Sequence, residues 1–163
     1  MPVALRPSTP ADADFDYRLY ASTRAEELAR TGWEAEATEA FLRTQYDAQT
    51  RSYRANHPGA SFDVILVEGR PAGRLYVDRG TEVIHVIAIA LLPEHRGGGI
   101  GTLLLAELLD EAATRGRRVT LSVERSNPAR RLYERLGFRA VRGDEVYLDL
   151  EWSPPPRAVP GPG

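Results

Sequence analysis

The chain contains no cysteine and no lysine among its 163 residues, so all 21 of its basic residues are arginine. Without cysteine, disulfide frameworks, thiol catalysis, iron–sulfur ligation and cysteine-containing zinc sites are excluded. Without lysine, the chain offers neither the phosphate-binding lysine of a Walker A loop nor an amine that forms a Schiff base. These two absences remove several large classes of enzyme.

Histidine is scarce as well. His57, His85 and His95 are the three imidazoles of the chain. No two of them stand at the spacing that aims two side chains of one helix at a single ion. We therefore expect no metal site.

The chain also lacks an excess of positive charge and a long apolar run. Its 21 basic and 23 acidic residues give a formal charge of −2, which does not favour a nucleic acid or an anionic membrane as partner. The longest apolar stretch, residues 83–92, is interrupted by His85 and is about half as long as a membrane-spanning helix. The N-terminus has no apolar signal-peptide core. These features predict a cytoplasmic protein that binds neither nucleic acid nor membrane.

The hydrophobic pattern predicts one α/β domain over residues 1–152, since the length and the 42% hydrophobic content suit a single core. Residues 153–163 hold five prolines and two glycines and are predicted to be a disordered tail. Residues 83–91 are rich in β-branched side chains and predict a central strand buried on both faces. Further strands are expected over 3–6, 62–67, 72–78, 117–123, 138–141 and 145–150. A first helix is expected to end at about Arg30, with Ser8, Thr9 and Asp12 as its candidate caps, and further helices over 34–56, 100–115 and from Asn127-Pro128 to Leu136.

A glycine-rich segment lies between the strand 83–91 and the helix 100–115. It consists of Arg96, Gly97, Gly98, Gly99, Ile100, Gly101 and Thr102. Glycines let backbone N–H groups approach a ligand closely, and a helix start adds unpaired donors, so the segment suits a phosphate or pyrophosphate. A plain tight turn is the alternative. A dinucleotide-binding loop is disfavoured because Leu104 stands where its third glycine is required.

A second segment follows about thirty residues further on, Asn127-Pro128-Ala129-Arg130-Arg131-Leu132-Tyr133-Glu134-Arg135-Leu136-Gly137-Phe138. In this order, the two segments resemble the GCN5-related N-acetyltransferase (GNAT) superfamily over residues 62–150, with the two N-terminal helices similar in order alone. The resemblance implies a mixed, mostly antiparallel sheet, split at its centre and flanked by helices on both faces. It also implies acyl transfer from an acyl-CoA, here acetyl-CoA, to a primary amine of a small molecule. A protein amine as acceptor, a non-catalytic acyl-CoA-binding module and a domain that binds no ligand are the alternatives.

The resemblance places the pyrophosphate of the cofactor on residues 96–102. It pairs the pantetheine arm with Ile89, Ala90 and Leu91, because the strand near residue 121 diverges there in the family. Asn127 either contacts the cofactor or caps the helix, and both roles are open. Many members place this asparagine seven residues before the tyrosine, whereas here the gap is six, with Ser126 at the seventh position.

For catalysis, the resemblance makes Tyr133 the general acid that protonates the leaving thiolate. The alternative is a core residue at the edge of the apolar face of its helix. The general base is expected to be His85, whose imidazole can accept a proton near neutral pH, although a lone histidine on an apolar strand is also a common core residue. Glu82, Glu124 or a water are the other candidates. Without cysteine, we expect direct attack in a ternary complex.

The two N-terminal helices normally flank the acceptor site in this fold. The candidate lining residues are Tyr20, Arg24, Gln45, Gln49 and Tyr53. The alternative is that these side chains only cover the sheet. Homodimers are common in the fold, and the sequence permits one here. The identity of the amine is left open.

Overall fold

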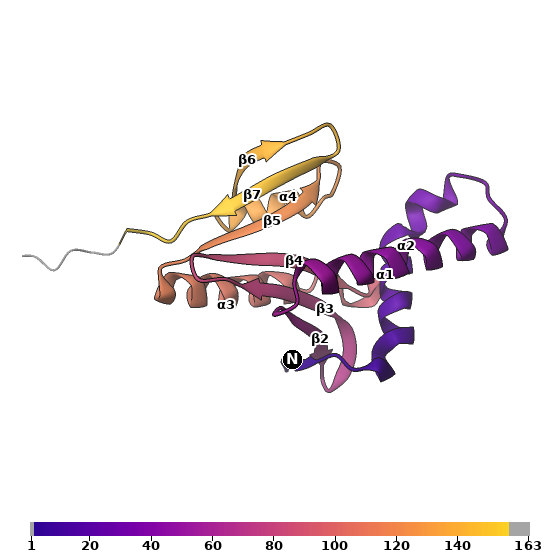
Figure 1. Cartoon of the computed structure of the whole chain (residues 1–163), viewed down its shortest axis with the longest axis horizontal. Coiled ribbons are helices and arrows are strands. Elements are labelled where there is room, and N and C mark those ends of the chain that lie inside the picture. The colour runs from indigo at the N-terminus through magenta and orange to yellow at the C-terminus, as the bar shows by residue number, and fades with distance from the viewer. Residues whose placement is uncertain (1, 157–163) are drawn as a thin grey trace, which may run out of the picture. The chain divides into compact units, whose positions relative to one another are not determined.

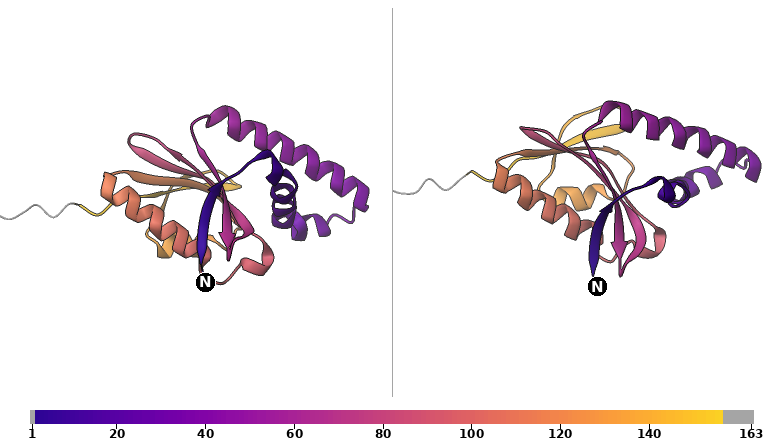
Figure 2. Two further views of the ribbon diagram at one scale, coloured as in Figure 1. Left: turned by 90° about the horizontal axis from the view of Figure 1, so that it is seen from below. Right: turned by 60° about the horizontal axis from the view of Figure 1, so that its bottom comes forward.

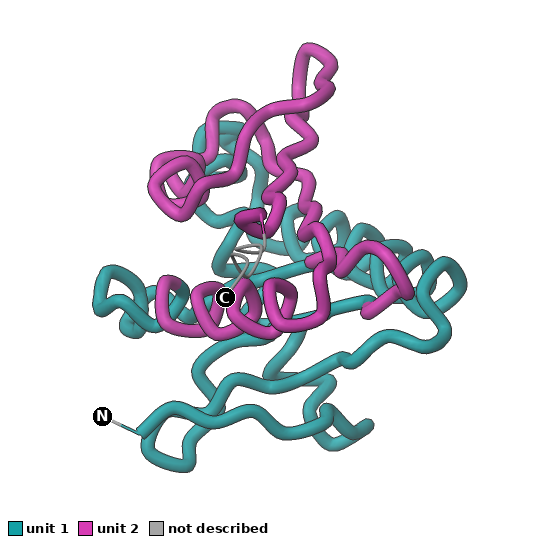
Figure 3. Tube along the Cα trace, turned by 90° about the vertical axis from the view of Figure 1, so that its left-hand side faces the viewer, with its two compact units in different colours: residues 1–78, 87–101 teal, residues 79–86, 102–163 magenta. Residues whose placement is uncertain are grey.

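The computed structural model describes residues 2–156, which divide into two compact units (Figure 3). Unit 1 comprises residues 1–78 and 87–101, and unit 2 comprises residues 79–86 and 102–163. Of the predicted tail, residues 153–156 form neither helix nor strand, and residues 157–163 lie outside the described residues.

Seven strands form a mixed, mostly antiparallel sheet, as predicted. Their hydrogen-bonded order is β1-β2-β3-β4-β5-β7-β6, and only β4 and β5 are described as a parallel pair (Figure 1). The strands are β1 (Val3–Pro7), β2 (Ser61–Val67), β3 (Arg70–Arg79), β4 (Val83–Leu91), β5 (Arg118–Glu124), β6 (Arg139–Gly143) and β7 (Tyr147–Trp152), and the helices are α1 (Ala13–Ala29), α2 (Ala35–Asn56), α3 (Ile100–Arg115) and α4 (Arg130–Arg135).

In unit 1, β1 pairs with β2 and β2 pairs with β3, both antiparallel. The turn between β2 and β3 contains Glu68 at φ 52° and Gly69 at φ 79°. Two successive left-handed residues match the twist of a tight hairpin, so the predicted hairpin is confirmed. Six consecutive residues of β3, from Ala72 to Val77, are buried, which makes β3 a strand covered on both faces.

The prediction that β4 is buried on both faces is wrong for most of the strand. Ile84 and Val86 are buried, but residues 87–91 are all half-buried. The parallel ladder with β5 joins Val83–Val86 to Arg118–Leu121 and ends there. The sequence pattern of β4 reflects β propensity, whereas burial depends on which segment lies beside each residue.

Helices α1 and α2 contact each other (Figure 2). An aromatic cluster that includes Tyr17, Tyr20 and Tyr46 joins them. The rings of Tyr17 and Tyr20 lie 5.6 and 5.8 Å from the ring of Tyr46. The connection between the helices contains Gly32 at φ 70°, a left-handed position that ends a helix without strain when it is glycine.

In unit 2, α4 begins later than predicted. The side-chain Oδ1 of Asn127 accepts a hydrogen bond from the N–H of Ala129 at 2.9 Å, and residues 128 and 129 form a turn before the helix starts at Arg130. Asn127 therefore caps this turn rather than the first helical residue. The last two strands also begin and end slightly later than expected, at Arg139–Gly143 and Tyr147–Trp152.

Every helix within residues 2–156 is too short or too polar to span a membrane. Within the same residues, no three histidine, aspartate or glutamate side chains are grouped so that they could hold a metal ion.

Candidate functional site

The glycine loop has backbone conformations that need glycine. Gly97 and Gly99 have φ values of 78° and 84°, a left-handed region that other residues avoid. A Cβ atom built on Gly97, Gly98 or Gly99 would meet no heavy atom within 4 Å. The loop is therefore exposed, and a ligand can approach its main chain directly.

Helix α3 starts immediately after the loop, at Ile100, whose side chain is buried. The first N–H groups of a helix have no partner within the helix and carry a partial positive charge. Loop and helix start thus present backbone donors from one short segment. Such an arrangement suits a phosphate or pyrophosphate.

The side chain of Arg96 makes two hydrogen bonds inside unit 1. Its Nε donates to the carbonyl oxygen of Leu91 at 2.9 Å, and its Nη2 donates to Oγ of Ser22 at 3.2 Å. Arg96 therefore ties the end of β4 to α1. This contact makes Arg96 a positioning residue as well as a candidate ligand of the pyrophosphate.

The end of β4 has one backbone edge that faces away from β3, and within residues 2–156 the ladder that β5 forms with β4 ends before it, at Val86. The N–H of Leu92 donates to the carbonyl of Ala72 on β3 at 2.8 Å, and a Cβ on Gly73 would lie 2.2 Å from the carbonyl oxygen of Ala90. The backbone N–H and C=O groups of successive strand residues point to opposite edges. Since those of Leu92 point towards β3, those of Leu91 point away from it. The carbonyl of Leu91 accepts a hydrogen bond from Arg96, and its N–H points to the same edge. Ile89 and Leu91 thus suit an extended, amide-bearing chain, as in strand addition.

Tyr133 lies in unit 2 on α4. Its ring is buried and stands edge-on to the ring of Phe138, with centroids 6.0 Å apart. Burial raises the pKa of the Tyr133 hydroxyl, because a phenolate is poorly solvated there. The side chain is therefore both a core residue and a protonated phenol at neutral pH.

His85 is also in unit 2, on the part of β4 that pairs with β5. Its Nδ1 hydrogen bonds with Oγ1 of Thr120 at 2.8 Å, and the two residues are partners in the ladder. The hydroxyl fixes the orientation of the imidazole ring. Glu82 and Glu124, the other candidate bases, are both exposed.

The predicted acceptor residues, all in unit 1, fall into three groups. Tyr20 is buried in the α1–α2 cluster, and its hydroxyl accepts a hydrogen bond from Nη1 of Arg24 at 2.8 Å. Gln49 and Tyr53 are half-buried, and Gln49 Oε1 accepts from Nη2 of Arg74 at 3.0 Å. Gln45 is exposed. Of the five, Gln49 and Tyr53 are the best placed to line a site beside β3, since Tyr53 also contacts Tyr76 on β3 at 6.2 Å between ring centroids.

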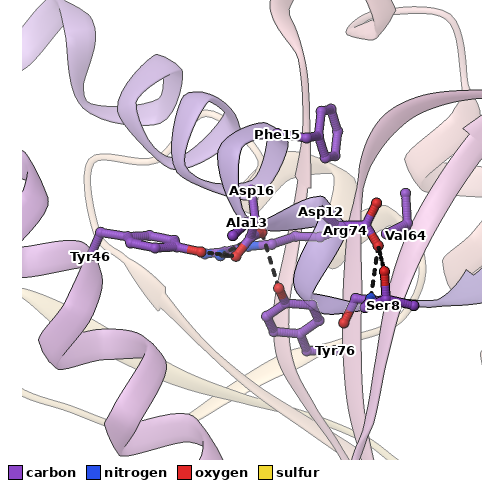
Figure 4. A pocket seen from close by; sticks show the side chains of 10 residues that line it. Ser8, Asp12, Ala13, Phe15, Asp16, Tyr46, Val64, Arg74 and Tyr76 are labelled. Atoms are coloured by element: carbon purple, nitrogen blue, oxygen red, sulfur yellow. Dashed lines mark hydrogen bonds and ion pairs between the residues drawn. The ribbon is translucent and has the colours of Figure 1, made fainter.

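Unit 1 contains a buried polar network that was not predicted from the sequence (Figure 4). Asp16 on α1 receives hydrogen bonds from the hydroxyls of Tyr46 and Tyr76, at 2.7 and 3.0 Å. It also forms an ion pair with Arg74 at 3.2 Å. The sequence signal for this network is the pair Arg74 and Tyr76. Because they stand two residues apart in an apolar strand, they share one face of β3 and make it polar.

Comparison with known proteins agrees with the resemblance seen in the glycine loop and the 127–138 segment. Residues 23–138 match the family model described as the Acetyltransferase (GNAT) family. A curated relative, the ribosomal-protein-bS18-alanine N-acetyltransferase of Haemophilus influenzae, is 44% identical over 54 residues. That alignment spans 32% of this chain and 37% of the relative.

Solved structures show the same fold. The PaiA N-acetyltransferase of Thermoplasma acidophilum, solved in complex with coenzyme A, superposes with a TM-score of 0.69 at 18% identity, covering 94% of this chain and 99% of that one. The ribosomal-protein-S18-alanine N-acetyltransferase of Escherichia coli superposes with a TM-score of 0.64 at 20% identity, covering 93% and 94%.

Proposed function

Because the chain belongs to the Acetyltransferase (GNAT) family, we propose that it transfers an acetyl group from acetyl-CoA to the primary amine of a small molecule. The observation that carries this proposal is the glycine loop. Its left-handed Gly97 and Gly99, the open space above them and the start of α3 together suit a pyrophosphate.

The chain's own residues supply the binding contacts. The N–H groups of residues 97–102 bind the pyrophosphate, and the edge of Ile89 and Leu91 that faces away from β3 binds the amides of the pantetheine arm. Arg96 holds the carbonyl of Leu91, which keeps that edge in place. The N–H of Leu91 is then available to polarise a thioester carbonyl.

Two side chains of unit 2 move the protons in this proposal. The thioester of acetyl-CoA supplies the activated acetyl group. His85, oriented by Thr120, accepts the proton of the attacking amine directly or through a water. Tyr133 donates its proton to the departing thiolate, for which its raised pKa keeps the proton available. Since the chain contains no cysteine, the amine attacks directly without a cysteinyl intermediate.

A second candidate acceptor is the N-terminal amine of a protein. The specific observation in its favour is the relative that is 44% identical over 54 residues, whose name gives an alanine of a ribosomal protein as substrate. Both candidates use the same cofactor site and the same chemistry. A cytoplasmic site of action and a homodimer stay predictions.

The test is release of CoA thiol from acetyl-CoA in the presence of an amine panel. Because the protein has no cysteine, a thiol reagent detects CoA alone. The panel contains amino acids, polyamines and a short peptide that begins with alanine. We expect amine-dependent thiol release, together with an acetylated product. Binding of acetyl-CoA without turnover on any amine would contradict the enzyme proposal and favour a regulatory acyl-CoA-binding module.

A further inference from the structure

One face of the sheet in unit 2 is polar and open to solvent. Burial alternates along β5, with buried side chains at Val119, Leu121 and Val123. Alternate residues of a strand point to opposite faces, so the side chains between them share the other face. These are Arg118, Thr120, Ser122 and Glu124. Thr120 is half-buried and the other three are exposed, so a molecule in solution can approach this face.

The polar face continues onto β7, which pairs with β5. Asp149 is the ladder partner of Ser122 and accepts a hydrogen bond from its hydroxyl at 2.5 Å. Glu151 is the ladder partner of Thr120, and its carboxylate accepts a hydrogen bond from Arg118 at 2.9 Å. On the side of β7, the carboxylate that faces Thr120 is therefore held by an arginine.

His85 stands on the same polar face, on the other side of Thr120. Ile84 and Val86 are buried, so His85 between them points to the face opposite theirs. Its Nδ1 lies 2.8 Å from Oγ1 of Thr120, its partner in the ladder. His85 itself is half-buried. This position differs from that of a residue in the apolar core.

The hydrogen bond between His85 and Thr120 can run in two directions, and only one of them leaves a base. A neutral imidazole has one N–H group and one nitrogen with a lone pair. If the hydroxyl of Thr120 donates, Nδ1 is the acceptor, and the one lone pair of the ring is already in use. If Nδ1–H donates to Oγ1, the lone pair is on Nε2 and can accept a proton.

The second direction also suits the charged ring. After Nε2 has accepted a proton, both ring nitrogens carry hydrogen and both are donors. Nδ1–H then still donates to Oγ1 of Thr120, so the same hydrogen bond serves His85 before and after the proton transfer. A charged donor strengthens this bond. Thr120 thus stabilises the imidazolium without any side chain having to turn, which is the preorganisation that favours catalysis.

We propose that Thr120 is a positioning residue that accepts a hydrogen bond from Nδ1–H of His85 and thereby makes Nε2 the atom that takes the proton of the attacking amine. This inference rests on the proposed function. In the step, the amine nitrogen bonds to the thioester carbon, its proton moves to Nε2 directly or through a water, and the C–S bond breaks as Tyr133 protonates the thiolate. His85 and Tyr133 then exchange protons with solvent. Thr120 neither gains nor loses a proton.

Nitrogen NMR of the imidazole tests the direction of the bond without any substrate. The three histidines are isotopically labelled, and the signal that is absent from His85→Gln is that of His85. The pH is raised until this signal stops changing, so that the neutral ring is observed. We expect its proton on Nδ1 in the wild type and in Thr120→Ser. In Thr120→Val, which keeps the β-branched shape but lacks the hydroxyl, we expect the proton to move to Nε2.

Steady-state kinetics in the thiol-release assay test the role in catalysis. We expect Thr120→Val to lower kcat by about ten- to a hundredfold, since a general base contributes about a hundredfold or more. The KM for acetyl-CoA should stay close to that of the wild type, and Thr120→Ser should restore most of kcat. The matched control is Thr114→Val, which by the same substitution removes an exposed hydroxyl that donates to the carbonyl of Asp110. Its kcat should equal that of the wild type.

A double-mutant cycle shows whether Thr120 acts through His85. We expect His85→Gln to lower kcat at least as much as Thr120→Val does. In the His85→Gln background, Thr120→Val should have no further effect on kcat. A further loss in that background would mean that Thr120 acts by another route, such as packing within the sheet, and would overturn the inference.

The inference can fail alone or together with the proposed function. A proton on Nε2 of neutral His85 in the wild type, or an unchanged kcat in Thr120→Val or His85→Gln, would overturn it, while acetylation by the wild type leaves the proposed function standing. If the wild type binds acetyl-CoA but acetylates no amine of the panel, the proposed function fails and this inference fails with it.

Discussion

At the scale of single residues, burial raises the pKa of several tyrosine hydroxyls, but their surroundings differ. The hydroxyl of Tyr17 donates to Glu39 at 2.8 Å, and those of Tyr46 and Tyr76 donate to Asp16. For Tyr133, burial is the cause of the raised pKa and no carboxylate contributes. The first three protons are therefore committed to structural hydrogen bonds, whereas the proton of Tyr133 is free to be given to a leaving group.

Replacing Tyr133 by phenylalanine removes this proton and keeps the ring that packs on Phe138. We expect kcat to fall by about a hundredfold or more, the usual contribution of a general acid, with little change in Tm. Because burial raises the pKa of the Tyr133 hydroxyl above its ordinary value, loss of its proton should not lower the wild-type rate at neutral or mildly alkaline pH. Steady-state kinetics from pH 6 to pH 10, with exposed Tyr147→Phe as control, measure both effects. Full kcat of Tyr133→Phe at every pH would refute the assignment.

Residues differ in how far the sequence predicts their role. The glycine loop and Tyr133 stand in short segments whose order is visible in the sequence. Asp16 and Arg74 are 58 positions apart in the sequence. No local pattern predicts which carboxylate will form an ion pair with an arginine in a strand. Gln45 illustrates the converse, since the resemblance made it a candidate for lining the acceptor site but the structure leaves it exposed.

At the scale of elements, strand ranges were easier to predict than strand surroundings. β4 runs over Val83–Leu91, as the β-branched pattern predicts. Its burial was mispredicted because the ladder with β5 ends at Val86. The number of paired residues depends on both strands, so the pattern of β4 alone does not predict it. The short helix was predicted from Asn127 and begins at Arg130, because the asparagine bonds the turn that precedes it.

The contact between β3 and the end of β4 depends on the absence of a side chain at Gly73. A Cβ there would lie 2.2 Å from the carbonyl oxygen of Ala90, so Gly73→Ala must push the two strands apart. We expect a loss of about 1–3 kcal/mol in the free energy of unfolding and weaker binding of acetyl-CoA. Gly59→Ala, where a Cβ meets nothing, serves as the control and should change the stability by less than about 0.5 kcal/mol. Unchanged stability and affinity in Gly73→Ala would contradict this account of the strand edge.

The short 3₁₀ helix Pro10–Asp12, which leads into α1, is stabilised by the carboxylate of Asp12, and this contribution depends on pH. A hydrogen bond from Arg6, and next the backbone N–H of Thr9, lower the pKa of Asp12 from 3.8 to about 2. A carboxyl group whose pKa is lowered by folding stabilises the folded state at pH values above its unfolded-state pKa. This stabilisation is lost as the pH falls towards the folded-state pKa.

Asp12→Asn should therefore cost about 1 kcal/mol at pH 7, as for the loss of a helix cap. The difference from wild type should shrink as the pH falls below about 5. Urea unfolding at steps from pH 7 to pH 3 measures this difference. Asp14→Asn, which changes an exposed carboxylate in the first turn of α1, is the comparison. A cost for Asp12→Asn that is constant over this range would contradict the proposed role of its charge.

At the scale of the whole molecule, the fold could be predicted because two motifs and the order of helices and strands all agreed. The mixed, mostly antiparallel sheet and the family followed from them. The acceptor could not be predicted, because the candidate lining residues stand on two helices and their contacts are distant in the sequence. Arg74 on β3, for example, bonds both Gln49 on α2 and Asp16 on α1.

The central claim is that the glycine loop holds an acyl-CoA, and thermal unfolding with and without acetyl-CoA tests it most directly. At a hundredfold excess over Kd, a ligand adds about 2.7 kcal/mol and should raise Tm by about 5–10 °C. Two matched variants complete the measurement. Gly99→Glu and Gly69→Glu both replace a glycine at a similar positive φ, 84° and 79°, with open space around it, but only Gly99 lies in the loop. We predict that acetyl-CoA, but not NAD, raises the Tm of the wild type and of Gly69→Glu. Acetyl-CoA should not raise the Tm of Gly99→Glu. Equal shifts in both variants, or no shift in the wild type, would contradict the claim.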